Sequence, residues 1–200
     1  MRVIGLTGGI ASGKSLVSQR LGELGAVVID ADKLGHETYR RGTETHRAVA
    51  EAFGQGVVGP DGEIDRRALG GKVFGDAEAR RRLEEIVWPA IRGLANERIA
   101  ELRAGGTPVV VLEAAVLIEA SWTDLVDEVW LVVASPETVR RRLADRNGLT
   151  AEQAEARMRA QLTNEKRRPY AQLIIENDGS PDDLRRAVDG AWSKLAARVG

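Results

Sequence analysis

Short apolar runs alternate along the chain with longer stretches in which apolar residues recur at helical spacing. A short apolar run bounded by turn residues is typical of a buried strand, and strands that alternate with helices favour a parallel α/β sheet. Helical spacing is clearest at 15–24, where Gly25 predicts the end of the helix. The predicted strands lie at 3–6, 26–29, 108–112, 128–133 and 173–176.

Between the second and third strands the strand pattern nearly disappears. Asp65 and Asp76 stand where N-caps of two helices are expected. We therefore expect an inserted helical, substrate-binding subdomain over 33–104. The sheet core would take 1–32, 105–146 and 169–200. The helical segments of the insert are predicted near 33–40, 44–53, 66–74, 77–87 and 90–104.

The last third of the chain contains three helix starts. Ser135 followed by Pro136 is a cap with proline at the first helical position. Thr150 with Gln153 forms a capping box, which predicts a helix running toward Lys166. We expect the charged segment 147–168 to be a lid that closes over a bound nucleotide and excludes water, with an ordinary surface helix as the alternative. Ser180 predicts the cap of a C-terminal helix.

A glycine-rich turn lies between the first predicted strand and helix. It matches the pattern G-x-x-x-x-G-K-[ST], whose backbone amides and following helix N-terminus form a cradle for phosphate groups. Lys14 would reach the terminal phosphates and Ser15 would offer its hydroxyl to a Mg²⁺ ion. The expected fold is therefore a P-loop core that binds ATP. The motif comprises Gly8, Gly9, Ile10, Ala11, Ser12, Gly13, Lys14 and Ser15, with Leu16 following it.

The strand before the motif and the helix after it make a chance glycine-rich turn a poor alternative. A nucleotide-dependent switch without an acceptor stays open, as does a kinase for another small molecule, such as a nucleoside.

Two aspartates follow the second predicted strand. Strand ends on this side of an open α/β sheet face the ligand crevice, and residues two apart share a side if the strand geometry persists. Asp32 is the candidate base that takes the proton of an acceptor hydroxyl. The alternative is that Asp32 only caps the next helix. For Asp30 we favour a hydrogen bond within the turn.

Composition excludes several classes of protein. The 29 basic and 30 acidic residues sum to a net charge of −1, which argues against a nucleic-acid partner held by bulk electrostatics. There is no cysteine, so disulfides and thiolate metal sites are excluded. We expect no membrane partner, and the cytosol is the expected compartment.

The ordered motifs resemble the dephospho-CoA kinase family over essentially the whole length. The resemblance rests on Leu6 through Ser15, on Val28 through Asp32, on Arg66 within 62–69, and on later segments. The later segments include Arg142, Arg146, Gln161, Glu165 with Lys166, and Asn177 through Ser180. Details such as 33–36 and 113–117 look closer to the kinase domain of the animal bifunctional CoA synthase.

The resemblance implies transfer of the ATP γ-phosphate to the ribose 3′-hydroxyl of dephospho-CoA, with Mg²⁺ and in a monomer or weak homo-oligomer. By the same resemblance Asp32 is the base and Gly8 through Leu16 hold the phosphates. Arg142 and Arg146 would be lid arginines, with Arg142 catalytic and Arg146 binding ATP. The remaining implied residues are Asn177 toward ATP and Arg66 toward the substrate. His36 follows Asp32 by four residues, so helical spacing makes it a candidate toward the substrate, with a surface or packing role as the alternative.

Three positions depart from the family pattern. Glu113 stands where an aspartate followed by a proline-containing stretch is usual, which puts its role toward Mg²⁺ in doubt. Trp88 replaces a common histidine before Pro89, so proton chemistry is not expected there. Gln172 replaces a frequent aspartate, a change that we interpret as neutral.

Overall fold

The computed structural model, which describes residues 1–199, contains a five-stranded sheet. The strands lie in the order β2-β3-β1-β4-β5, and the β1–β3, β1–β4 and β4–β5 pairs are parallel. All five strand predictions are confirmed to within two residues. The strands are β1 (Arg2–Gly8), β2 (Val27–Asp30), β3 (Val109–Glu113), β4 (Glu128–Val133) and β5 (Leu173–Glu176).

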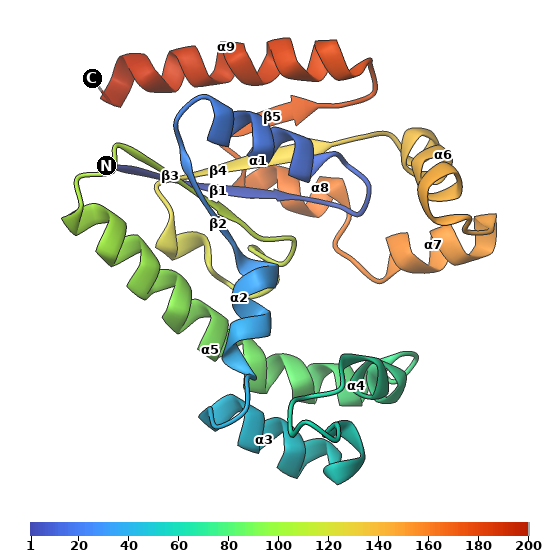
Figure 1. The fold of residues 1–200 in the computed structure, drawn as a ribbon. Helices are drawn as coiled ribbons and strands as arrows, with labels where there is room; N and C mark the ends of the chain where they lie inside the picture. Colours follow the sequence, from blue (N-terminus) through green and yellow to red (C-terminus); the bar gives the residue numbers. More distant parts are fainter. Residues whose placement is uncertain (200) are drawn as a thin grey trace. The chain divides into compact units, whose positions relative to one another are not determined.

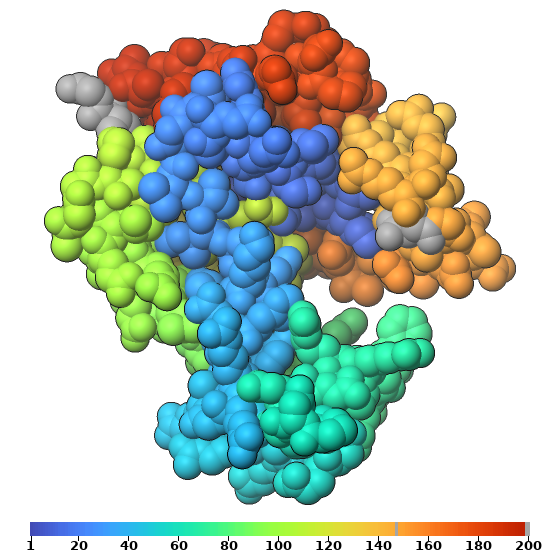
Figure 2. Space-filling view, in the orientation of Figure 1, coloured from blue at the N-terminus to red at the C-terminus, as the bar shows by residue number. Residues whose placement is uncertain are grey.

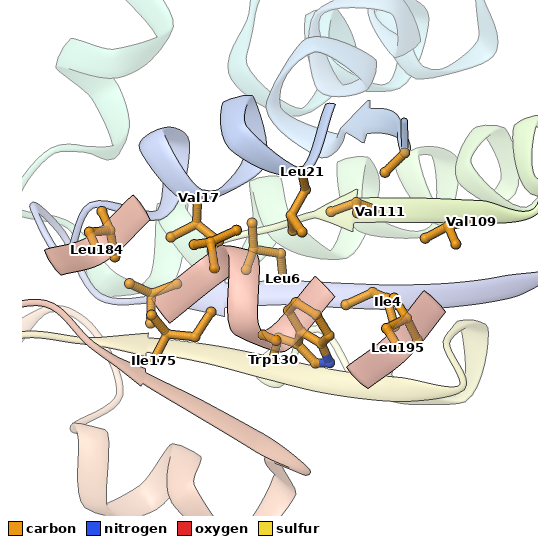
Figure 3. Close-up of a cluster of buried hydrophobic side chains, with 14 residues drawn as sticks. Ile4, Leu6, Val17, Leu21, Val109, Val111, Trp130, Ile175, Leu184 and Leu195 are labelled. Atoms are coloured by element: carbon orange, nitrogen blue, oxygen red, sulfur yellow. The ribbon is translucent and has the colours of Figure 1, made fainter. Parts of the chain in front are cut away.

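Helices α1 (Lys14–Glu23) and α9 (Pro181–Val199) cover one face of this sheet, as Figures 1 and 3 show. Their inward side chains Val17, Leu21 and Leu195 are fully buried against Ile4 and Trp130. Each such side chain contributes on the order of 1.5–3 kcal/mol when it leaves water. This apolar layer holds β1 and α1 in place, and with them the turn that joins the two.

Helices α6 (Pro136–Asn147) and α7 (Ala151–Arg159) lie side by side at the surface, in orange in Figures 1 and 2. Ser135 caps α6 and the capping box of Thr150 with Gln153 starts α7, both as predicted. The expected continuation to Lys166 is wrong. The helix ends at Arg159, and Thr163 accepts a hydrogen bond from the Lys166 amide to start a separate short helix, α8 (Asn164–Arg167).

The segment Asp30–Arg98 forms a compact unit of its own. Its helices are α2 (Ala31–Thr38), α3 (Glu44–Phe53), α4 (Arg66–Val73) and most of α5 (Ala77–Ala104). Asp65 and Asp76 accept hydrogen bonds from the first amides of α4 and α5, as predicted. Single-turn 3₁₀ helices occur in the chain at Gln55–Val57, Thr123–Leu125 and Arg168–Tyr170.

The predicted break between helices at 77–87 and 90–104 is wrong, because α5 runs unbroken through Pro89. A proline inside a helix removes one backbone hydrogen bond and crowds the preceding turn. Here the apolar stripe continues across it, with Val87, Ile91 and Ala95 buried at intervals of four residues. Burial along this stripe offsets the lost hydrogen bond. Among the described helices, none is both long and apolar enough to cross a membrane.

Candidate active site

The phosphate loop Gly8–Ser15 connects β1 to α1, and two of its glycines are sterically required. A Cβ atom on Gly8 would lie 2.5 Å from the carbonyl oxygen of Val132 in the neighbouring strand β4. Gly13 has a φ of +96°, and a Cβ there would lie 2.0 Å from Nδ2 of Asn177. Only glycine fits both positions, because other residues need space that β4 and Asn177 occupy.

The start of α1 is open toward a ligand. Gly13 occupies the N-cap position and no side chain caps it. The first amides of a helix have no partner within the helix, and they carry the positive end of its dipole. Ala11 adopts a left-handed φ of 53°, which is uncommon outside glycine and is a form of backbone strain that gathers at ligand sites. The loop therefore has the geometry of an anion cradle.

Lys14 and Ser15 occupy the first turn of α1, at the end of the loop. The ammonium Nζ of Lys14 donates a hydrogen bond of 2.7 Å to Oε1 of Glu113, at the end of β3. Ser15 is exposed, so its hydroxyl is open to solvent. Sequence reasoning left the role of Glu113 in doubt, and the structure brings its carboxylate to the lysine of the motif.

Arg142 and Asn177 hold the phosphate loop at the backbone of Ala11 and Ser12. The guanidinium of Arg142 donates to the carbonyl oxygens of Ala11 and Ser12, at 3.1 and 3.4 Å, and to the carbonyl oxygen of Asn177 at 2.8 Å. Nδ2 of the buried Asn177 donates to the Ser12 carbonyl at 2.7 Å. Burial lowers the pKa of Arg142 from its usual range. In this structure Arg142 therefore supports the loop backbone, and a role toward the transferring phosphate stays a prediction.

A cavity of about 390 Å³ opens over the loop. Arg146, Arg157 and Gln161 line it, and the expected role of Arg146 in binding ATP stays a prediction. Oε1 of Gln161 accepts a hydrogen bond of 2.8 Å from the amide of Ile10. Arg157 was not predicted, because an isolated arginine on a charged helix belongs to no motif. Gln161 was named only as part of the resemblance to the family.

Apolar contacts join the loop to α6 and α7. Ile10 and Ala11 pack against a small buried cluster that includes Leu143 and Ala154. The segment predicted as a lid is thus in contact with the phosphate loop through both polar and apolar side chains.

The two aspartates after β2 have different local roles. Asp30 is the N-cap of α2, and its carboxylate accepts hydrogen bonds from the amides of Asp32 and Lys33. This confirms the turn role favoured for Asp30. The strand geometry does not persist past Asp30, because Asp32 already lies in the first turn of α2. Asp32 is exposed, and its carboxylate makes no hydrogen bond or ion pair with the described residues.

The unit Asp30–Arg98 brings together the two residues predicted for the substrate. Nη1 of Arg66 lies 2.8 Å from Nε2 of His36, and Tyr39 stands edge-on to the His36 ring. A guanidinium can only donate, so Nε2 of His36 accepts in this hydrogen bond. Burial raises the pKa of the Tyr39 hydroxyl, and the Arg66 charge offsets only part of this increase. His36 and Arg66 thus form a hydrogen-bonded pair within this unit.

Comparison with known proteins agrees with this geometry. The family model for dephospho-CoA kinase matches residues 2–183. The chain is 53% identical to the dephospho-CoA kinase of Geobacter sulfurreducens, over 97% of this chain and 98% of the relative. It is 48% identical to that of Symbiobacterium thermophilum, over 100% of this chain and 84% of the relative.

Several solved structures share the fold of this chain. A Thermus thermophilus protein matches with a TM-score of 0.80 and 37% identity, over 97% of both chains. The dephospho-CoA kinase of Campylobacter jejuni matches with a TM-score of 0.66 and 25% identity, again over 97% of both chains. Shikimate kinase from Acinetobacter baumannii, with a TM-score of 0.55, 16% identity and 99% and 94% coverage, shares the fold.

The parallel sheet, the phosphate loop and these structural neighbours define the chain as a P-loop kinase. Within that class the family match and the curated relatives are consistent over nearly the full length. The chain belongs to the dephospho-CoA kinase family.

Proposed function

We propose that this chain transfers the γ-phosphate of ATP to the ribose 3′-hydroxyl of dephospho-CoA. The observation that carries the proposal is the formed phosphate loop, with Lys14 in place, in a member of this family. The oxygen of the acceptor hydroxyl attacks the γ-phosphorus and its proton passes to a base. The bond between the γ-phosphorus and the β–γ bridging oxygen breaks, and ADP leaves.

Asp32 is the proposed base. Its carboxylate is exposed and uncommitted, since Asp30 performs the capping of α2. A free carboxylate can accept the hydroxyl proton as the phosphoryl group arrives, and phosphoryl transfer otherwise depends on positioning and charge stabilisation. His36 and Arg66 are proposed to bind the acceptor, because their exposed pair places a guanidinium cation beside an imidazole ring.

The residues at the loop fit a Mg²⁺ ion. Mg²⁺ in phosphoryl-transfer sites is held by one or two protein oxygens together with phosphate oxygens and waters. The Ser15 hydroxyl and the Glu113 carboxylate are oxygen donors of this kind, although Glu113 is paired with Lys14 in this structure. When bound, the ion would neutralise charge on the terminal phosphates. Lys14 would add a second positive charge there.

The segment 147–168 is proposed to be the lid. Arg157 of this segment and Arg146 just before it line the cavity over the loop, within which they would pair with phosphate oxygens. The contacts of the segment with Ile10 and Ala11 of the loop support the lid role as well. A cytoplasmic location and a monomeric or weakly associated state stay predictions.

The test is ADP release from Mg·ATP with and without dephospho-CoA, together with the mass of the product. Acceptor-dependent ADP and a product heavier by one phosphoryl group are expected. Shikimate and a set of nucleosides serve as control acceptors. A larger rate with one of these would replace the proposed substrate, and bound ATP without any acceptor-dependent ADP would favour a nucleotide switch.

A further inference from the structure

A second ion pair adjoins the phosphate loop, apart from Lys14 and Glu113. Nη2 of Arg167 donates to Oε1 of Glu119 at 2.8 Å. The Arg167 side chain is 1% exposed, which is rare for a charged residue. A Cβ atom built on Gly9 would lie 3.4 Å from Nη1 of Arg167, so this guanidinium borders the space next to Gly9 at the beginning of the loop. A buried cation thus lies beside the loop at Gly9.

In the described part of the chain, the buried side-chain atoms without a hydrogen-bond partner belong to the phosphate loop and to this ion pair. Within the described residues, three buried side-chain atoms have no hydrogen-bond partner, namely Oγ of Ser12, Oε2 of Glu119 and Nε of Arg167. One belongs to the loop and the other two to the ion pair beside it. Leaving a buried polar atom unpaired costs about 1–3 kcal/mol. Such atoms point to a functional constraint rather than to a pair optimised for stability.

Both members of the pair lie in hydrogen-bonded elements. Glu119 lies in a turn after β3 that is closed by hydrogen bonds from Ala120 to Val116 and from Ser121 to Ile118. Arg167 is the last residue of α8, and its amide donates to the Thr163 carbonyl. The guanidinium therefore has a fixed position, set by Glu119 from one side and by α8 from the other.

We infer that Arg167 is a positioning residue for the phosphate loop, oriented by Glu119. The inference rests on the proposed function, in which the loop binds ATP. Arg167 fixes the backbone at Gly9, next to the Ile10 amide that Gln161 holds. A loop fixed in this way presents its amides to phosphate without reorganisation, which strengthens nucleotide binding.

The test must separate positioning from stability. Removing one member of a buried pair leaves an unpaired charge and is strongly destabilising, whereas replacing both by uncharged groups of similar volume is often tolerated. The informative variant is therefore the double substitution Arg167→Met with Glu119→Gln. Its matched control is Arg198→Met with Glu128→Gln, since Arg198 and Glu128 form another ion pair of 2.8 Å with Glu128 largely buried.

The measurement is calorimetric titration with Mg·ADP, without any acceptor, alongside thermal unfolding of each protein. Outer-shell residues that orient the ligands of a metal site typically account for about 10- to 100-fold in metal affinity or activity, and we use this range for a residue that orients the loop. We expect a loss of that size in the Arg167 and Glu119 double variant, and a similar rise in the KM for ATP. The control pair should bind Mg·ADP as the wild type does. Arg167→Lys, with Glu119 unchanged, should bind Mg·ADP more tightly than the double variant but less tightly than the wild type. Lysine keeps the charge but not the planar fork of the guanidinium.

Unchanged Mg·ADP affinity in the folded double variant would overturn the inference and leave the pair a structural one. If the double variant does not fold, Arg167→Lys decides the question, because it keeps both charges of the pair and removes only the planar fork. Weaker Mg·ADP binding in that variant supports the inference, and unchanged binding overturns it. Because no acceptor is present, the result stands apart from the proposed function, which fails only if the wild type does not phosphorylate dephospho-CoA.

Discussion

Nζ of Lys14 lies 2.7 Å from Oε1 of Glu113, so the cation of the phosphate loop has a carboxylate counterion at the end of β3, the strand beside β1 in the sheet. The pairing follows from the sheet register, in which Leu6 of β1 stands opposite Glu113 of β3. Both side chains are largely buried, at 14% and 11% exposed. The carboxylate therefore fixes the position of the Lys14 ammonium group beside the end of β3.

Replacing Lys14 by alanine should abolish most of the turnover. The ammonium group stabilises charge that develops on the transferring phosphoryl group, and removing one such donor typically lowers kcat by about 10²- to 10³-fold. Steady-state ADP release measures the loss, with circular dichroism to confirm folding. Glu113→Gln is the companion variant, because its amide oxygen can still accept from Lys14. A kcat near the wild-type value in Lys14→Ala would contradict the role of the lysine.

Asp32→Asn should lose turnover while the KM for the acceptor changes little. The amide cannot accept the hydroxyl proton, and positioned general bases contribute about 10²- to 10⁴-fold. Asp30→Asn is the matched control, since asparagine caps a helix as well as aspartate does and only the charge is removed. Activity should persist in Asp30→Asn. If Asp32→Asn keeps a near wild-type kcat, the base lies elsewhere.

Gly13→Ala should destabilise the chain and prevent nucleotide binding. The substitution places a Cβ in the left-handed region and 2.0 Å from Nδ2 of Asn177, which is bonded to the Ser12 carbonyl. Gly25→Ala is the control, because Gly25 has a φ of +111° and no atom within 4 Å of the added Cβ. It should show backbone strain alone, on the order of 1–2 kcal/mol.

Thermal unfolding and Mg·ADP titration of both variants separate the two effects. An equal decrease in thermal stability in Gly13→Ala and Gly25→Ala would show that the collision with Asn177 is relieved without cost. Loss of Mg·ADP binding in Gly13→Ala alone would show that this substitution distorts the phosphate loop.

Asp178→Asn should lower thermal stability at neutral pH, and less so in acid. The amide of Ser135 donates to Oδ1 of Asp178 at 2.8 Å. This bond, with one from the Thr138 side chain, holds the pKa of Asp178 below its usual range. A carboxyl whose pKa is lowered by folding stabilises the protein above its unfolded pKa. That stabilisation is lost as the pH falls through the folded pKa.

The difference in unfolding midpoint between wild type and Asp178→Asn should therefore narrow as the pH is lowered below the usual aspartate range. A difference that stays constant with pH would mean that the Ser135 bond does not depend on the charge of Asp178.

The sequence predicted the strands well because each is an apolar run bounded by turn residues. It misjudged α5, since Pro89 is a strong local signal for a break and the burial of Val87 and Ile91 on one stripe outweighs it. It also merged α7 with α8, because the charged segment after Arg159 keeps helix-forming composition although Thr163 starts a new cap.

Within the site, the phosphate loop was predictable because its chemistry is local in sequence. The pair of Arg167 with Glu119 was not, because its members lie 48 residues apart and neither belongs to a motif recognisable from spacing. The role of Arg142 toward phosphate, expected from family likeness, stays a prediction, and its hydrogen bonds to the carbonyl oxygens of Ala11 and Asn177 were not foreseen. Such a contact depends on how α6 packs, which no local pattern encodes.

The hydrogen bonds that hold the loop come from far along the chain. Arg142, Gln161 and Asn177 contact it across separations of 131, 151 and 165 residues. The eight-residue motif is therefore not a self-contained module. Transplanted to another strand–turn–helix scaffold, the same letters would keep their glycines but lose the side chains that set their backbone. Engineering a phosphate site from this protein means moving the supports along with the loop.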